Sequence, residues 1–426
     1  MQVSYSDLFR VFGRVGLLSF GGPAAQISLM QTELVDKRGW LSDTQFLQAL
    51  SFCMLLPGPE AMQLATYAGW RMRGTMGGLL AGLLFVLPGA AVILALAFGY
   101  AYYGQVPLVQ TLFAGVKAAV VVIVFQALFK LARRALTDGR ARAFALAAFL
   151  AIFFLGVPFP LIIAAAALAG LLLARPAATP PPAPPGTATA PARTLSTIVL
   201  WLAIWGAPVA LVWALDHRLL LELALFFSKL AVVTFGGAYA VLAYMTQEIV
   251  QSYGWLSTAQ MIDALGLAET TPGPLILVTE FAAFMTGFLQ GGPGLAIAAA
   301  AITLWVTFVP CFLWIFAAAP YVETLLARPR LQGAFDAISA SVAGVILNLA
   351  VWFTFNVLFR DLPQGQGAPD LTAGSFVPLN AALIGLAALL FLGMRLPMLA
   401  GLAAMAAAAG AIGMIFPERL GSALLF

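Results

Sequence analysis

The sequence predicts an all-α polytopic membrane protein. Two inverted-topology repeats of about six segments each are joined by a linker helix, giving about 13 segments. Hydrophobic residues make up 62% of the 426-residue chain and charged residues only 9%, whereas soluble domains carry roughly 25% charged residues. Apolar segments of about 20 residues, enough to cross a bilayer as a helix, recur from end to end. An internal duplication is the third observation behind this prediction.

The duplication is centred on two pairs of helix-breaking clusters. Residues 20–59 and 235–274 align without a gap at an offset of 215 (235 − 20) and are identical at 17 of 40 positions. The clusters are Phe-Gly-Gly-Pro at 20–23, Phe-Gly-Gly at 235–237, and Pro-Gly-Pro at 57–59 and 272–274. Glycine exposes backbone, and proline cannot continue a helix from the preceding turn. Matching interruptions in two halves predict broken or re-entrant helices and point to a transporter binding site.

The first repeat is predicted over residues 1–174. Its segments are a broken one at 6–36, a second broken one at 44–70, full spans at 75–103 and 107–130, and a tight helical hairpin at 143–174. The sequence leaves open whether the broken segments cross the bilayer or turn back. If the hairpin crosses only once, both the segment count and the sidedness change.

A linker and a second repeat follow. Residues 175–194, rich in Pro, Ala and Thr, are predicted to form a semi-rigid, extended linker. Residues 195–215 are predicted to form a connecting transmembrane helix. The second repeat is predicted over residues 219–426, where two broken segments precede spans at 294–318, 335–357, 377–393 and 397–415.

The basic residues predict the topology. Residues 130–142 carry five Lys or Arg against one Asp, and Arg71 and Arg73 mark a second cytoplasmic face. The matching region of the second repeat, around residues 287–294, has no basic residue, as inversion predicts. Because one linker helix inverts the second repeat, the N-terminus is expected in the cytoplasm and the C-terminus outside.

A cation stands six residues before the first break of each copy. Arg14 aligns with Lys229 at the same offset of 215. A charge in the bilayer interior costs about 2.5–3.5 kcal/mol even on lenient scales. We therefore expect both to face a shared midplane cavity and bind an anion. The alternative is that both sit at helix ends and snorkel to lipid head groups, which is the interpretation favoured for Arg10.

The prolines are placed to open half-helices. Pro23, Pro59 and Pro274 each precede apolar sequence, and a helix N-terminus offers unpaired N–H groups and a positive dipole end to an anion. The alternative is that the glycines only allow close helix packing. The backbone elements of the predicted site are Gly21, Gly22, Pro23, Pro57, Gly58, Pro59, Gly236, Gly237, Pro272, Gly273 and Pro274.

Three polar side chains are added to the predicted site. Ser19 and Thr234 are matched hydroxyls beside the breaks, and the Gln63 amide could donate a hydrogen bond to an oxyanion.

The carboxylates near the breaks fall into two groups. Glu60, Glu269 and Glu280 flank the Pro-Gly-Pro clusters and are candidates to carry a coupling proton. Glu33 and Glu248 repeat between the copies, but each lies near a polar connector, so they are interpreted as interface anchors and caps.

Other function classes find little support. The chain shows no His/Cys/Asp metal cluster and no glycine-serine nucleophile elbow, so neither an enzyme nor a metal site is expected. No cofactor is predicted. The formal charge of +4 comes from short loops and does not suggest nucleic acid. The lipid bilayer is the expected environment, and a homodimer is left open.

The combined motifs resemble the chromate transporter family of bacterial membrane proteins, in its long, two-domain form. The residues that carry the resemblance are the duplicated Phe-Gly-Gly segments, the Gly-Trp-Leu-Ser connectors at 39–42 and 254–257, and both Pro-Gly-Pro breaks. Ala238 replaces the proline of the first copy. The resemblance implies a transporter of the inner (plasma) membrane that exports chromate and gives chromate resistance, with sulfate as a related substrate.

Electrostatics agrees with export of a dianion. A negative interior favours expulsion by about 2.3 kcal/mol per charge per 100 mV, so two charges gain about 4.6 kcal/mol. The expected mechanism is alternating access at a site between the inverted repeats. The alternatives are a sulfate or other oxyanion carrier and an anion channel.

Overall fold

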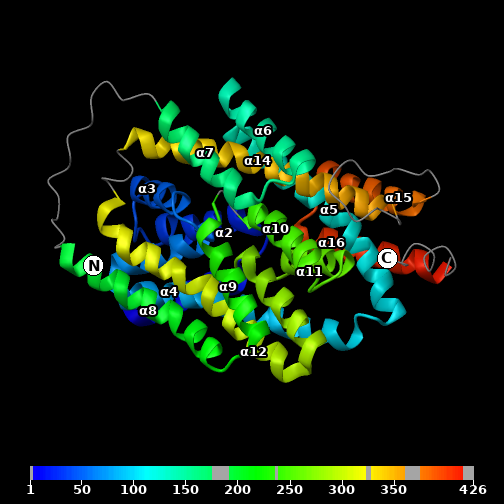
Figure 1. Cartoon of the computed structure of the whole chain (residues 1–426), viewed down its shortest axis with the longest axis horizontal. Helices are drawn as coiled ribbons and strands as arrows, with labels where there is room; N and C mark the ends of the chain where they lie inside the picture. The colour runs from blue at the N-terminus through cyan, green and yellow to red at the C-terminus, as the bar shows by residue number, and fades with distance from the viewer. Residues whose placement is uncertain (1–2, 175–190, 236–237, 323–327, 360–374, 416–426) are drawn as a thin grey trace. The chain divides into compact units, whose positions relative to one another are not determined.

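The computed structural model describes residues 3–174, 191–235, 238–322, 328–359 and 375–415 (Figure 1). Within these ranges the chain is helical almost throughout, apart from turns and one isolated β-bridge between Phe359 and Phe376. The predicted all-α class is therefore confirmed. Six of the described helices are long and apolar enough to cross a membrane.

The helices of the first half follow the predicted segments. They are α1 (Tyr5–Leu18), α2 (Gly22–Gln31), the π-helical turn η1 (Thr32–Asp36), α3 (Asp43–Met54), α4 (Glu60–Tyr103), α5 (Pro107–Ala135), α6 (Gly139–Leu155) and α7 (Phe159–Leu173). The two broken segments are divided where the sequence places Gly-Gly-Pro and Pro-Gly-Pro. The predicted hairpin is α6, a short turn and α7. Gly156 ends α6 with a φ of 60°, and its N–H donates to the Ile152 carbonyl, which is a common helix C-cap.

The described helices of the second half come next. Its helices are α8 (Pro191–Ala214), α9 (Arg218–Val233), α10 (Ala238–Gln247), η2 (Glu248–Ser252), α11 (Thr258–Thr270), η3 (Leu275–Leu277), α12 (Val278–Ala318), η4 (Ala319–Tyr321), α14 (Pro329–Leu358), α15 (Pro378–Ala388), η6 (Leu389–Gly393) and α16 (Met398–Ile415). Helix α8 is the predicted connecting helix, but it begins at Pro191. The last four residues assigned to the linker are therefore helical, because proline suits the first turn of a helix. The linker at 175–190 lies outside the described residues.

Two of the long helices contain a reversal. In α4 the backbone leaves helical angles at Arg73 and Gly74, where Gly74 has a φ of 64°. A Cβ on Gly69 would lie 2.3 Å from the Gly77 carbonyl oxygen, so the two limbs of α4 touch backbone to backbone. In α12 the same reversal occurs at Gly291 and Gly292. Each is a helical hairpin rather than one straight span.

The described residues form two compact units, and each unit draws on both repeats. The first unit comprises residues 1–95, 167–241 and 271–335, and the second comprises residues 96–166, 242–270 and 336–426. The predicted division at 1–174 and 219–426 follows the sequence repeat instead and stays a prediction about that repeat.

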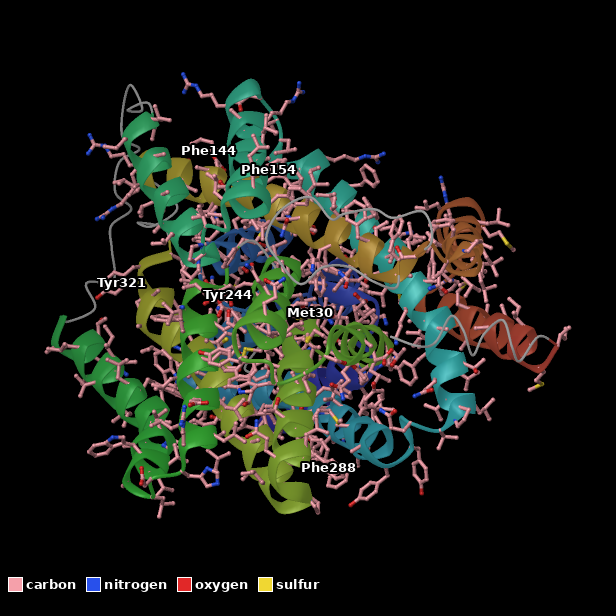
Figure 2. The ribbon with its side chains drawn as sticks, turned by 45° about the vertical axis from the view of Figure 1, so that its right-hand side comes forward. Met30, Phe144, Phe154, Tyr244, Phe288 and Tyr321 are labelled. Carbon is pink, nitrogen blue, oxygen red and sulfur yellow. The ribbon has the colours of Figure 1, made fainter. Side chains whose placement is uncertain are left out.

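In the first unit, α8, α9 and α12 lie side by side (Figure 1). The Trp201 ring of α8 stacks on Phe312 and Phe316 of α12, with ring centroids 5.6 and 5.3 Å apart. Helix α1 lies against α4, where a Cβ on Gly16 would come within 2.0 Å of the Leu84 carbonyl oxygen. Met30 of α2, which belongs to this unit, is fully buried (Figure 2).

In the second unit, the helices of one repeat pack on those of the other. A Cβ on Gly115 of α5 would lie 2.1 Å from the Met405 carbonyl oxygen of α16, and α15 covers the same face of α5. Conversely, a Cβ on Gly344 of α14 would lie 2.0 Å from the Ala145 carbonyl oxygen of α6. Small residues permit such close approach in membranes. Its apolar core consists of Ala118, Ala119, Val122, Ile123, Leu383, Ala387, Phe391, Leu402 and Met405.

Candidate functional site

The two Pro-Gly-Pro breaks are bonded to the opposite copies of the Phe-Gly-Gly segment. The Gly58 N–H donates to the Thr234 carbonyl at 2.9 Å, and the Gly273 N–H donates to the Ser19 carbonyl at 3.0 Å. These bonds are reciprocal, since Gly58 and Gly273 correspond in the duplication, as do Ser19 and Thr234. All four residues belong to the first unit. The breaks that are far apart in sequence are therefore brought together.

The glycine at the centre of each Pro-Gly-Pro has a backbone conformation that other residues rarely adopt. Gly58 has a φ of 118° and Gly273 a φ of 88°. A Cβ on Gly58 would lie 2.9 Å from both the Cys311 Sγ and the Gln63 Nε2. A Cβ on Gly273 would lie 3.2 Å from Leu277 Cδ1. Both positions are tight as well as strained, so the duplicated glycines are required by the local geometry.

The predicted half-helix starts are borne out in the first copy. Pro23 lies in the first turn of α2, whose N-cap is Gly21, and α4 begins directly after Pro59. In the second copy, Pro274 precedes the 3-10 turn η3, and α12 begins only at Val278. Gly236 and Gly237 lie outside the described residues. Gly22 has a φ of 78° and no neighbour within 4 Å of a Cβ placed on it.

Two buried glutamine side chains donate hydrogen bonds to backbone carbonyls of the Pro-Gly-Pro breaks. The Gln63 Nε2 donates to the Pro57 carbonyl at 2.6 Å, and the Gln63 Oε1 is buried with no hydrogen-bond partner. One of the two N–H groups of the Gln63 amide is thus bonded to the break itself, and its role toward an oxyanion stays a prediction. The Gln26 Nε2 donates to the Gly273 carbonyl at 2.6 Å. Sequence reasoning missed Gln26, although an amide in the middle of apolar α2 was a signal.

The matched hydroxyls are bonded to their own helices. The Ser19 Oγ donates to the Val15 carbonyl at 2.5 Å, and the Thr234 Oγ1 donates to the Leu230 carbonyl. Both side chains are buried. Their protons are therefore engaged, although their lone pairs remain able to accept a hydrogen bond.

Helix α12 carries a buried polar stripe that sequence reasoning also missed. Thr303, Thr307 and Cys311 follow one another at four-residue spacing and so lie on one helix face. The hydroxyls of Thr303 and Thr307 are buried without a hydrogen-bond partner, as is the Trp314 Nε1 one turn beyond Cys311. Buried threonines in membrane helices usually bond to a carbonyl of the preceding turn, as Thr286 does at 2.7 Å. The stripe therefore offers unsatisfied polar atoms next to the first break, because Cys311 approaches Gly58.

The two predicted cations have different surroundings. Arg14 is exposed, with 58% of its side chain accessible, and its guanidinium lies 3.9 Å from a carboxylate oxygen of Glu33, whose side chain is 1% exposed. The Lys37 ammonium lies 2.8 Å from Glu33, and Arg38 donates to the other carboxylate oxygen. Lys229 is partly buried in α9.

The Glu33 carboxylate is held in its charged form. Burial by itself raises the pKa of this group. The hydrogen bonds and charges of Lys37 and Arg38 outweigh burial, so the pKa of Glu33 lies below its ordinary value. The interpretation of Glu33 as a simple anchor misses this role, since it organises three cations.

The proposed coupling carboxylates are divided between the two units. Glu60 is the first residue of α4, and Glu280 is the third residue of α12; both belong to the first unit. Glu269 lies in the second unit, near the end of α11. The Glu280 Oε2 is buried with no hydrogen-bond partner. Among the described residues, no group of three or more His, Cys, Asp or Glu side chains could hold a metal ion.

Comparison with known proteins gives a consistent result. The model of the chromate transporter family matches residues 6–171 and 221–414. The chromate transport protein of Pseudomonas aeruginosa is 33% identical over 87% of this chain and 85% of its own length. The probable chromate transport protein of Synechococcus elongatus is 31% identical over 82% and 84%, and the chromate transport protein of Cupriavidus metallidurans is 30% identical over 81% of each chain. No solved structure matches. The chain belongs to the chromate transporter family.

Proposed function

We propose that this protein exports chromate from the bacterial cytoplasm across the inner membrane and thereby confers chromate resistance. Family membership supports chromate transport, and the apolar helices support a multi-pass membrane protein. The single observation that carries the site is the pair of reciprocal bonds between the breaks, Gly58 to Thr234 and Gly273 to Ser19. Two repeats facing each other across such a centre are suited to alternating access.

The polar groups around the first Pro-Gly-Pro break suit a tetrahedral oxyanion. The half-helix at Pro59 offers backbone N–H groups and the positive end of its dipole. The hydroxyls of Thr303 and Thr307 and the indole N–H of Trp314 are donors with no other partner. Glycines at the breaks let oxygens approach the backbone. In this proposal the anion takes the place of partners that these groups lack within the protein.

The cluster around Glu33 adds positive charge. Arg14, Lys37 and Arg38 against one carboxylate leave a net charge of +2 (three minus one) among these four side chains. Lys37 and Arg38 already satisfy Glu33, and the Arg14 contact of 3.9 Å is longer than a direct hydrogen bond. Arg14 can therefore turn to an arriving dianion without leaving Glu33 unpaired. Lys229 is proposed to act as its counterpart in the second copy.

The membrane potential supplies a driving force for export. Two negative charges gain about 4.6 kcal/mol on leaving a cell at roughly 100 mV, negative inside, which sustains about three decades of gradient. The N-terminus is proposed to be cytoplasmic and the C-terminus outside. The contact of Arg73 with Tyr5, at 5.1 Å to the ring centroid, agrees with one shared face for Arg73 and the N-terminus.

The test is chromate uptake into everted membrane vesicles, which corresponds to export from the cell. Arg14→Ala and Lys229→Ala should each abolish uptake while the protein is still expressed. Arg10→Ala is the matched control, because Arg10 is exposed one turn earlier on α1 and is expected to keep uptake. Normal transport by both charge variants would refute the proposed binding role.

Two related functions are separated by further measurements. Sulfate is also a tetrahedral dianion, so unlabelled sulfate added to the same vesicles shows whether the site prefers it to chromate. A channel would pass single-channel currents in a planar bilayer, whereas an alternating-access carrier would not.

A further inference from the structure

The second unit contains a buried ion pair that the proposed anion site does not use. The Lys117 Nζ of α5 lies 3.5 Å from the Asp263 Oδ1 of α11, and the side chains are 13% and 7% exposed. The Tyr100 hydroxyl of α4 donates to the Asp263 Oδ2 at 2.8 Å. Lys117 is the eleventh residue of the 29-residue membrane-length helix α5, well away from either end. An ionisable pair at such a position is expected to be functional.

The pair lies in apolar surroundings. Next to Lys117, the side chain of Val116 contacts α11, where a Cβ on Gly266 would meet Val116 Cγ1 at 2.3 Å. Ala118 and Ala119 belong to the apolar core of the unit. Burying two charges costs several kcal/mol for each, and their attraction repays this only if every lone pair and proton is well bonded.

Only one of the two carboxylate oxygens of Asp263 accepts a hydrogen bond. Its Oδ2 has a short hydrogen bond from Tyr100, but its Oδ1 faces Lys117 at a distance longer than the roughly 2.7–2.9 Å of a strong charge-assisted bond. Oδ1 is therefore the atom at which a proton can be added with the smallest loss of existing bonding.

Few other titratable groups surround this carboxylate in the described part of the chain. On α5 the remaining cations, Lys130, Arg133 and Arg134, lie more than three turns beyond Lys117. On α4, Tyr102 and Tyr103 are exposed. Helix α16, which also packs on α11, carries no titratable side chain. On α11 itself the other acid is Glu269. Burial acts against the charged form of Asp263, and Lys117 and Tyr100 are the groups that favour it.

We propose that Asp263 is a proton-binding site of the transport cycle, with Lys117 as its built-in counter-charge; this rests on the proposed chromate transport. A proton forms an O–H bond at Oδ1, and Lys117 keeps its own proton. The charge of the pair then changes from zero to +1, which favours a protein loaded with a dianion. By linkage, a bound dianion in turn raises the proton affinity of the pair.

The competing interpretation is that Tyr100, Lys117 and Asp263 only stabilise the packing of α4, α5 and α11. Proteoliposomes of the full-length protein, with a trapped pH-sensitive dye, separate the two, because chromate and proton movements are read together. The wild type should move protons whenever chromate moves. In Asp263→Asn the ratio of protons to chromate should fall at least tenfold. The control Asp138→Asn alters an exposed helix cap and should keep the wild-type ratio.

Two variants test the structural interpretation directly. Asp263→Asn combined with Lys117→Gln removes both charges and keeps polar packing. If the trio is only structural, this double variant regains the wild-type ratio, and the inference is overturned. Glu280→Gln tests another buried carboxylate, and loss of proton movement in that variant but not in Asp263→Asn also overturns the inference.

Tyr100→Phe decides the question if Asp263→Asn does not fold or moves no chromate. It keeps the ion pair and removes one hydrogen bond to the charged carboxylate, so the proton should bind more readily. The midpoint of the pH profile of chromate flux should move up by about one unit; an unchanged profile refutes the inference. Wild-type chromate movement without protons overturns the inference alone. No wild-type chromate movement under any gradient overturns the proposed function as well.

Discussion

Replacing Gly58 with alanine tests whether the first Pro-Gly-Pro break needs its observed geometry. The residue has a φ of 118°, and its new Cβ would lie 2.9 Å from the Cys311 Sγ and 2.9 Å from the Gln63 Nε2. Neither neighbour moves freely. Cys311 sits on α12 and is buried, and the Gln63 Nε2 is already bonded to the Pro57 carbonyl at 2.6 Å.

The magnitude follows from two terms. Holding a residue with a Cβ at positive φ costs about 1–2 kcal/mol, and displacing the Gln63 amide sacrifices a hydrogen bond of about 1 kcal/mol. Gly58→Ala should therefore lower the free energy of unfolding by about 2–3 kcal/mol. Chromate uptake into vesicles should fall at least tenfold, because the Gly58 N–H bond to Thr234 holds the two copies together.

The assay is chemical unfolding of the purified protein in detergent, alongside vesicle uptake. Gly13→Ala is the matched control, because Gly13 lies inside α1 with no atom within 4 Å of the added Cβ, and alanine favours a helix by about 1 kcal/mol. Gly58→Ala combined with Cys311→Ala should recover part of the lost free energy of unfolding, because the Cys311 Sγ is then absent. Equal stability of Gly58→Ala and the wild type would refute the reasoning, as would an equal loss in Gly13→Ala.

Three further changes probe other parts of the protein. Gly89→Ala should destabilise by about 1–3 kcal/mol in thermal unfolding, because its Cβ would lie 2.2 Å from the rigid Pro272 carbonyl oxygen; a wild-type melting temperature would contradict this contact. Glu33 has a lowered pKa when folded, so it stabilises the protein at neutral pH and loses that contribution as pH falls below its ordinary value of about 4.3. Glu33→Gln should therefore be less stable than the wild type at pH 7, and the gap should close under acid; a gap that widens would disprove the sign. Thr307→Val should raise the KM for chromate about tenfold without loss of stability, since its hydroxyl has no partner, whereas Thr286→Val should lose about 1 kcal/mol of stability and keep its KM.

The helical architecture could be predicted because glycine and proline act locally. The breaks at 20–23 and 57–59 and the hairpin turn at Gly156 each follow from the backbone preferences of one or two residues. The reversal at Gly74 falls between segments predicted at 44–70 and 75–103. Such features need no knowledge of the rest of the chain.

The partners at the site could not be predicted, because they depend on contacts between residues distant in sequence. Gln26 and Gly273 are 247 residues apart, and nothing local to either indicates the other. Lys117 was visible as a charge within an apolar segment, but its pairing with Asp263 needed the packing of α5 on α11. Arg14 and Lys229 were predicted from the duplication, and their role in binding remains a proposal.

Both bonds between the copies run from one main chain to another, so among replacements only one that removes the N–H group itself, such as proline at Gly58 or Gly273, deletes a bond directly. The sequences of the two halves can therefore diverge while these backbone hydrogen bonds still join the halves. One half is free to specialise, as the lone Gln63 and the polar stripe of α12 illustrate. A polypeptide that ended after the first half would lack the hydrogen-bond partners of the Gly58 N–H and the Ser19 carbonyl. It would have to associate with a second half-length chain that supplies those partners.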